Sequence, residues 1–267
     1  MTETLSDALS RAAGADHLLI ALDFDGTLAP FTEDPADSRP LPEAREALDA
    51  LAGLPRTTVA IISGRPLEFL REVVDPARRM VLSGSHGAEM DLAALPDLPD
   101  DAEHDIHLTA EQLDLLDRAV DATEEMVSRY PGSRAELKPA GVCFHTRPIR
   151  DPRVSEQALE EMNRAYSELQ GLRITPGQQV VECSVLSATK GDGLRIIQAA
   201  ASPDVTVFAG DDVTDEDAMD LLTGEDLGIK VGEKESVATQ RVSGPQELAD
   251  VLSVFADQRA RAVTSIK

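Results

Sequence analysis

The 267-residue chain carries 49 acidic and 25 basic side chains, which gives a formal net charge of −24. Binding to a nucleic-acid backbone requires clustered Lys and Arg, so this balance excludes a general nucleic-acid-binding role. A small anionic substrate remains compatible with it, because a bound divalent cation and a few local basic residues outweigh the global field at contact distance.

Two further features bear on the cellular setting. No apolar stretch approaches the roughly 20 residues that span a bilayer, and the first residues lack the basic and apolar regions of a signal peptide. We therefore expect a soluble cytoplasmic protein with no membrane partner. A monomer is expected as well. Cys143 and Cys183 cannot form a disulfide framework, and their spacing matches no zinc motif. Both are expected to be free thiols.

The first predicted elements are a helix over residues 3–13 and a strand over 18–22. The strand is a short apolar run with abrupt flanks, which is typical of a buried parallel strand. It ends on Asp23 and Asp25, and Gly26 after them permits a sharp backbone turn. Ligands bind at the carboxyl ends of strands in open α/β sheets, so these carboxylates stand where chemistry is expected. The alternative is a solvated turn that only closes the strand.

Helices and strands then alternate. The expected segments are a proline-bearing loop over 29–42, a helix over 43–53, a strand over 58–62, a helix from 66 to about 74 and a strand over 80–82. The second of the three strands ends at Ser63, and the third runs into Ser85–Glu89. This order predicts a parallel sheet with right-handed crossovers.

Composition changes after this point. Residues 91–105 are acidic and proline-bearing, which is typical of a linker or loop. Helical spacing and strand alternation then predict an α-β-β-α-β-β unit of about 95 residues. Its helices are expected over 113–130 and 153–169, and its strands in a hairpin over 135–147 and over 172–175 and 178–183.

The hairpin over 135–147 is expected to have one apolar and one polar face, because side chains alternate along a strand. The alternation places Val142, Phe144 and Thr146 on one face and Cys143, His145 and Arg147 on the other. The second set carries groups that can contact a polar ligand.

The α/β pattern resumes with a helix that opens at Lys190 and a strand over 205–209. This strand also ends on acids, in a run that contains Asp211, Asp212 and Asp215. A strand over 227–231 and a helix over 245–257 complete the pattern. The simplest organisation is an α/β domain of residues 1–90 and 187–267, interrupted by an inserted α/β domain of residues 91–186.

Two Asp-rich strand ends form a group of hard oxygen donors, which suits Mg²⁺ better than zinc or copper. Isolated aspartates are ionised at neutral pH, so carboxylates packed together repel one another, and a divalent cation relieves that repulsion. We therefore expect a Mg²⁺ site. The alternative is an acidic loop that binds no metal.

A carboxylate beside Mg²⁺ can attack a phosphoryl group and form an aspartyl-phosphate that water later hydrolyses. Lys190 could hold both the nucleophile and the phosphate, while the Ser63 hydroxyl and the Gly64 amide could donate to the phosphoryl oxygens. No phosphate-loop or serine-hydrolase motif is present to favour another chemistry. The set of residues indicates a phosphatase.

The same motifs, Asp23-x-Asp25, Ser63, Lys190 and the Asp211 run, resemble the haloacid dehalogenase superfamily of aspartate-nucleophile phosphatases. The resemblance implies a Rossmann-like parallel-sheet core. It also implies that Asp23 is the nucleophile and Asp25 the general acid and base, and that Ser63 and Lys190 hold the phosphoryl group. Asp211 would bind Mg²⁺ together with Asp23 and the Asp25 carbonyl. Asp212 and Asp215 would bind the metal through water molecules or would hold its direct ligands in place.

Finer features resemble the trehalose-6-phosphate phosphatase branch of that superfamily. They are Asp23–Pro30, Ser63-Gly64-Arg65, Ser85–Glu89, Lys138-Pro139, His145-x-Arg147 and Gly210–Glu216. The resemblance implies that the inserted domain is a cap of the C2 type. Expected substrate contacts are Gly64, Arg65, Lys138, His145, Arg147 and Glu182. One departure is that Cys183-Ser184-Val185 follows Glu182 where the family often has Arg-Pro.

The expected activity is thus that of a phosphoric monoester hydrolase that converts trehalose 6-phosphate to trehalose and phosphate with Mg²⁺. The alternatives are a related phosphatase acting on sucrose 6-phosphate or mannosyl-3-phosphoglycerate, or a non-catalytic sugar-phosphate-binding regulator. The retention of both Asp23 and Asp25 disfavours the regulator.

Overall fold

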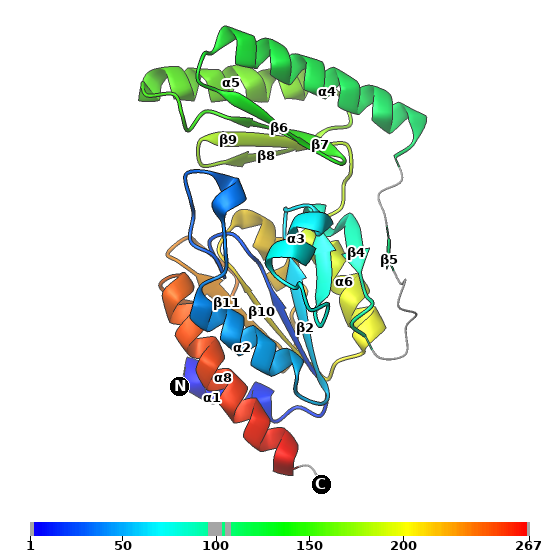
Figure 1. The fold of residues 1–267 in the computed structure, drawn as a ribbon, viewed down its shortest axis with the longest axis vertical. Helices are drawn as coiled ribbons and strands as arrows, with labels where there is room; N and C mark the ends of the chain where they lie inside the picture. Colours follow the sequence, from blue (N-terminus) through cyan, green and yellow to red (C-terminus); the bar gives the residue numbers. More distant parts are fainter. Residues whose placement is uncertain (1–2, 96–102, 105–107, 266–267) are drawn as a thin grey trace. The chain divides into compact units, whose positions relative to one another are not determined.

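A computed structural model describes residues 3–95, 103–104 and 108–265 (Figure 1). The chain divides into two compact units, one of residues Met1–Asp105 and Ala188–Lys267 and the other of residues Ile106–Ser187. Each unit has a sheet and a hydrophobic core of its own. The boundary expected after residue 90 lies within strand β4 (Glu89–Asp91), which pairs with β3 (Val81–Gly84) in the first unit.

The first unit contains an eight-stranded sheet in the order β12-β11-β10-β1-β2-β3-β4-β5. Its parallel strands are β1 (Leu18–Leu22), β2 (Thr57–Ile62), β3, β10 (Val205–Gly210), β11 (Leu227–Val231) and β12 (Gln240–Val242). The expected α/β fold with a parallel sheet is confirmed. Strands β4, β5 (Glu103–His104) and β12 were not predicted, because segments of two or three residues are too short to show a period.

Helices cover both faces of this sheet. The helices of the first unit are α1 (Leu5–Ala13), α2 (Pro42–Ala52), α3 (Leu67–Val73), α6 (Lys190–Ala201), α7 (Glu216–Met219) and α8 (Pro245–Ser265). Short 3₁₀ turns lie at η1 (Pro35–Asp37), η2 (Ser85–Gly87) and η3 (Val213–Asp215). Figure 1 shows α1, α2 and α8 together on one face, and α6 packs from the other.

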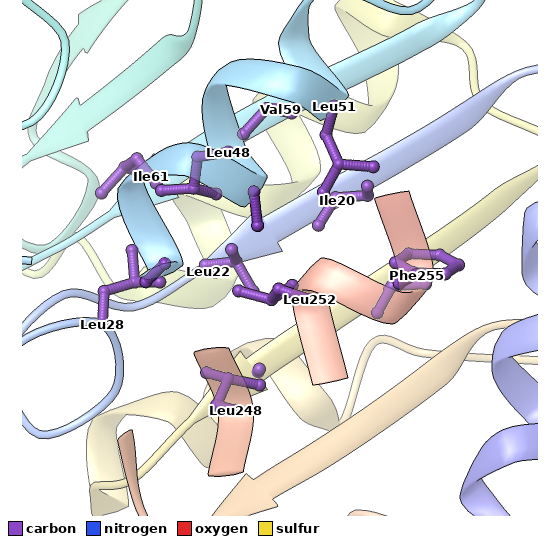
Figure 2. Close-up of a cluster of buried hydrophobic side chains, with 14 of the residues drawn as sticks. Ile20, Leu22, Leu28, Leu48, Leu51, Val59, Ile61, Leu248, Leu252 and Phe255 are labelled. Atoms are coloured by element: carbon purple, nitrogen blue, oxygen red, sulfur yellow. The ribbon is translucent and has the colours of Figure 1, made fainter. Parts of the chain in front are cut away.

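Strand β1 is apolar throughout because both of its faces are buried. Leu18, Ile20 and Leu22 belong to the core beneath α1, α2 and α8, whereas Leu19 and Ala21 belong to the core beneath α6. Figure 2 shows the first of these cores, where side chains of α2 and α8 meet those of β1 and β2. This two-sided burial explains why β1 is a continuous apolar run rather than an alternating one.

The second unit has an antiparallel four-stranded sheet in the order β6-β7-β9-β8. Its elements are α4 (Ala110–Arg129), β6 (Arg134–Lys138), β7 (Gly141–His145), α5 (Pro152–Glu168), β8 (Arg173–Gly177) and β9 (Val180–Ser184). This is the α-β-β-α-β-β order expected from the sequence. Val142 and Phe144 of β7 pack with residues of α4 and α5 such as Met126 and Met162. Strand β7 ends at His145, so the expected alternation does not extend to Arg147.

Within the described part of the chain, no helix is both long and apolar enough to cross a membrane.

A buried arginine ties the last helix to the first unit. Arg259 is fully buried and donates to the carbonyls of Ala13 at 2.9 Å and Arg56 at 2.6 Å and to the Thr57 hydroxyl at 2.9 Å. Helix α8 was expected to end near residue 257, and this was wrong because a charged side chain beyond that point faces the protein rather than solvent.

The Arg259→Ala variant is expected to lose about 3 kcal/mol of unfolding free energy, because several buried acceptors lose their donor at once. Arg261→Ala, on an exposed position of the same helix, should cost less than about 0.5 kcal/mol. Urea denaturation of both variants measures the difference, and equal losses would contradict the role assigned to Arg259.

Candidate active site

Three neighbouring strands end at one edge of the parallel sheet. Leu22 of β1 is in register with Ile61 of β2 and Ala209 of β10. The residues that follow these strands therefore lie side by side, and the Asp23 amide donates to the Ala209 carbonyl at 2.9 Å. The sheet thus brings Asp23 together with the acidic run after β10, as the sequence predicted.

Lys190 joins the two acidic segments. It is the first residue of α6, whose N-terminus is capped by Thr189 in a capping box. The Lys190 ammonium donates to Asp23 Oδ1 at 2.6 Å and to Asp215 Oδ1 at 2.7 Å, and its side chain is 4% exposed. An ion pair this buried has lost its hydration, so the ammonium fixes the orientation of both carboxylates.

The carboxylates of Asp23, Asp211 and Asp215 form a compact group, in which one oxygen from each lies within 4.8 Å of the other two. A glycine is needed at position 26 for two reasons. Its φ of +81° is one that other residues rarely adopt, and a Cβ there would collide with the Asp211 carboxylate. The Thr27 hydroxyl donates to Asp23 Oδ2 at 3.0 Å. These oxygens are a suitable ligand set for a divalent metal ion.

Electrostatics also favour a cation in this group. Burial raises the pKa of Asp23 well above its ordinary value, and Asp215 and Asp211 raise it further although Lys190 opposes them. Burial, with Asp215 adding to it, raises the pKa of Asp211 to about 6. Burial lowers the pKa of Lys190, but its two carboxylate partners outweigh that and raise it overall. When all three carboxylates are ionised, they and the Lys190 ammonium carry two net negative charges, which is the charge that one divalent cation would balance.

Neighbouring acids have cationic partners of their own. Asp212 accepts from Lys234 at 2.7 Å, and Glu216 accepts from the buried Lys230 at 2.8 Å. Burial raises the pKa of Asp212, but the Lys234 hydrogen bond, the Val213 amide and the charges of Lys234 and Lys190 together outweigh this and leave the pKa lowered. Asp212 is not one of the three clustered carboxylates, so its role as a metal ligand stays a prediction.

Asp25 is held by Arg65 rather than by the Lys190 group. Arg65 Nε donates to Asp25 Oδ2 at 2.6 Å, Arg65 Nη2 donates to Oδ1 at 2.7 Å, and the Ser38 hydroxyl donates to Oδ1 at 3.0 Å. The guanidinium lies 4.6 Å above the ring of Phe69, which fixes its plane. Arg65 was expected to contact substrate. In the structure its bidentate contact orients Asp25.

The segment Ser85–Glu89 supports the loop after β2. The amide of His86 donates to the Ser63 carbonyl at 2.9 Å, and the His86 imidazole lies against Gly64. Gly87, with φ of +100°, passes so close to the Thr189 carbonyl that a side chain would collide. The turn η2 therefore contacts both the Ser63–Gly64 loop and the start of α6, the two segments expected to hold phosphate.

On the second unit, the expected sugar-contacting side chains lie on the sheet face opposite α4 and α5. Lys138 Nζ donates to Glu182 Oε2 at 2.7 Å. His145 Nε2 lies 2.7 Å from Glu136 Oε2. The register of the strands thus brings Lys138, His145 and Glu182 onto one face. Glu136 was missed, although its position two residues before Lys138 on β6 puts both side chains on the same face.

Several other residues that shape the site were also missed. They are Thr27, Ser38, Phe69, His86, Glu89 and Lys230, each of which contacts an expected site residue or its loop. Glu89, for example, accepts from the Leu67 amide at 3.1 Å and the Ser85 hydroxyl at 2.6 Å. The motifs Asp23–Pro30 and Ser85–Glu89 contain three of them, Thr27, His86 and Glu89, and the other three had no sequence signal.

The chain is similar to known proteins over most of its length. A family model described as trehalose-phosphatase matches residues 21–251. The trehalose-phosphate phosphatase of Mycobacterium marinum is 31% identical over 275 residues, which cover 95% of this chain and 66% of that relative. The chain therefore spans slightly less than two thirds of the relative's length.

Solved structures share the fold. The C-terminal domain of Candida albicans trehalose-6-phosphate phosphatase matches with a TM-score of 0.80 at 23% identity, covering 96% of this chain and 98% of that one. A sugar phosphatase of haloacid dehalogenase subclass IIB matches with a TM-score of 0.58 at 14% identity, covering 89% and 98%. Together with the family model, these likenesses show that the chain belongs to the trehalose-phosphatase family and has the haloacid dehalogenase fold.

Proposed function

We propose that the protein hydrolyses trehalose 6-phosphate to trehalose and phosphate, with Mg²⁺, through an aspartyl-phosphate on Asp23. The observation that carries this proposal is the buried Lys190 ammonium between Asp23 and Asp215, at the sheet edge where three carboxylates gather. Family membership and the name of the Mycobacterium marinum relative support the choice of substrate.

In the first step, an Asp23 carboxylate oxygen attacks phosphorus and the bond from phosphorus to the sugar oxygen breaks. Lys190 and Thr27 fix the Asp23 carboxylate by hydrogen bonds to its two oxygens, so little rotational freedom is left to lose. The Ser63 hydroxyl and the Gly64 amide donate to the phosphoryl oxygens. The departing sugar oxygen takes a proton from Asp25.

In the second step, Asp25 removes a proton from water as the water attacks phosphorus, and the Asp23 carboxylate is restored. A carboxylate that accepts two hydrogen bonds from Arg65 is in the form that this step requires. The first step instead requires Asp25 to carry a proton. We infer that the contact with Arg65 loosens before the sugar leaves and re-forms afterwards.

Mg²⁺ would be held by Asp23, Asp211 and the backbone carbonyl of Asp25, with Asp215 and Asp212 in support. When bound it would neutralise charge on the phosphoryl oxygens. The ligand set fits, because the clustered oxygens carry the excess negative charge of the site and the neighbouring Asp212 and Glu216 pair with lysines.

Substrate choice is assigned to the second unit, which we propose to be a C2-type cap. Lys138, Glu182, His145 and Glu136 supply donors and acceptors of the kind that bind sugar hydroxyls. Arg147 is proposed as a further contact from the turn after β7. The cytoplasmic location and the monomeric state stay predictions.

The Asp23→Asn variant is expected to lose at least about a thousandfold in kcat, because an amide keeps the shape of the carboxylate but cannot attack phosphorus. Its thermal unfolding midpoint should stay within a few degrees of the parent. Asp220→Asn, an exposed substitution of the same chemistry, serves as the control and should retain full activity. Parental turnover in Asp23→Asn would remove Asp23 as the nucleophile.

Metal binding should depend on pH through Asp211. Its pKa is raised from 3.8 to about 6, so the metal-free folded protein binds this proton more tightly than the unfolded chain does. The resulting stability, at most about 3 kcal/mol, is present at low pH and is lost as pH rises through that window. Mg²⁺ should therefore raise the thermal midpoint more at about pH 7.5 than at about pH 5, where it must displace the proton.

Differential scanning fluorimetry with and without Mg²⁺ measures this dependence. In the Asp211→Asn variant, Mg²⁺ should raise the thermal midpoint only slightly at both pH values. The amide has no negative charge to bind the metal and no carboxyl proton for the metal to displace. A shift in the parent protein as large at the lower pH as at the higher one would contradict the assignment of Asp211 to the metal.

The Lys138→Ala variant should raise KM for trehalose 6-phosphate about tenfold with little change in kcat. The lost ammonium is assigned to the sugar and not to the reacting phosphoryl group. The matched control is Arg153→Ala, at an exposed position on α5. A fall in kcat with unchanged KM would rule out the assigned role.

The same assay, run on trehalose 6-phosphate, sucrose 6-phosphate and mannosyl-3-phosphoglycerate with and without EDTA, tests the substrate and the metal. We expect a clear preference for trehalose 6-phosphate and loss of activity with EDTA. Preference for another of these phosphates would contradict trehalose 6-phosphate as the substrate and identify the preferred phosphate in its place. Absence of hydrolysis of all three would favour the regulator.

A further inference from the structure

The sheet face of the second unit opposite α4 and α5 brings together a thiol, an imidazole and carboxylates. Cys143 on β7 is in register with Glu136 on β6 and with Glu182 on β9, and His145 lies two residues along on the same face. A sulfur, nitrogen or oxygen atom from each of Cys143, His145 and Glu136 lies within 4.8 Å of the other two. Cys143 Sγ also lies 3.2 Å from Glu182 Oε2.

These donors differ in kind from the oxygen-only group at Asp23. Thiolate, imidazole and carboxylate together are a typical ligand set for Zn²⁺, whereas oxygen donors alone suit Mg²⁺. Zinc bonds of about 2.3 Å to sulfur and about 2.0 Å to nitrogen put tetrahedral ligand atoms about 3.5 Å apart. Atoms that already lie within 4.8 Å reach this spacing by small side-chain rotations.

We propose that Zn²⁺ binds to Glu136, Cys143 and His145 on this face. The spacing of Cys143 and Cys183 along the chain matches no zinc motif, so the sequence did not predict this site. The three ligands come instead from two adjacent strands, where cross-strand register rather than sequence spacing sets their separation.

The charges on this face are compatible with a dication. Glu136 and Glu182 carry two negative charges and Lys138 carries one positive charge, with its ammonium on Glu182 at 2.7 Å. On binding, the Cys143 S–H bond breaks, its proton goes to solvent and a sulfur–zinc bond forms, with no change of oxidation state. The deprotonated sulfur adds a second net negative charge. Zinc also takes the place of the hydrogen bond between His145 Nε2 and Glu136, and the hydrogen that leaves Nε2 passes through solvent to Nδ1 of the same ring, which stays neutral.

One consequence rests on the proposed function. The zinc ligands include the side chains assigned to the sugar hydroxyls, so zinc on this face and substrate should exclude one another. Zinc inhibition of this origin would raise KM and leave kcat unchanged.

The test uses the 267-residue protein, treated with EDTA, desalted and then saturated with Mg²⁺ so that the oxygen-only group is occupied. Co²⁺ serves as the probe, because it takes zinc sites and gives a near-ultraviolet charge-transfer band when a thiolate binds it. We expect one equivalent of Co²⁺ to produce this band and Zn²⁺ to abolish it by displacement.

Cys183→Ala is the matched control, since Cys183 lies in the core on the opposite face of the same sheet. It should keep the band, and Cys143→Ala should lose it. If Cys143→Ala does not fold by circular dichroism, His145→Ala takes its place and should weaken Co²⁺ binding at least tenfold. Absence of the band in the parent protein, its persistence in Cys143→Ala, or unchanged affinity in His145→Ala would overturn the proposal.

This readout involves no phosphate hydrolysis. A protein that binds zinc but hydrolyses no sugar phosphate would contradict the proposed function and leave the zinc site standing. The reverse result would contradict only the zinc site.

Discussion

The Lys190 ammonium between Asp23 and Asp215 is the contact on which the site depends. It joins the end of β1 to the acidic segment after β10 through the first residue of α6. Burial strengthens the contact. It also makes the contact necessary, because without the ammonium the buried carboxylates would lie close together with no positive charge to offset their repulsion. The core beneath α6 and the turn η2 therefore serve the chemistry indirectly, since they keep α6 at this edge of the sheet.

Charge is partitioned sharply around that contact. The chain as a whole is strongly acidic, yet the acids next to the site are paired, Asp25 with Arg65, Asp212 with Lys234 and Glu216 with Lys230. The three clustered carboxylates and the Lys190 ammonium carry a net negative charge when all are ionised. A cation and a phosphate dianion can thus meet there although the net charge of the protein repels anions.

Much of this arrangement could be predicted from the sequence, and the limits have a physical cause. Runs such as 18–22 and 205–209 predicted buried parallel strands, and the acids after them therefore had to meet at one edge. The contact of Arg65 with Asp25 and the burial of Arg259 and Lys230 had no such signal. These features depend on which distant segments pack together. In the sequence, a charged side chain that will be buried looks the same as one that will be exposed to solvent. Glu136 was missed for a different reason. Side-chain alternation along β6 puts it on the same face as Lys138, but the sequence prediction assigned faces only to residues 142–147.

The most direct test of the central claim is a rapid acid quench of the wild-type protein during its first turnover of trehalose 6-phosphate, followed by mass spectrometry of the peptide that contains Asp23. The account predicts a transient phosphoryl group on Asp23 that forms before phosphate is released and then decays. Phosphate release with no phosphoryl group on the protein at any time, or with the group on another residue, would contradict it.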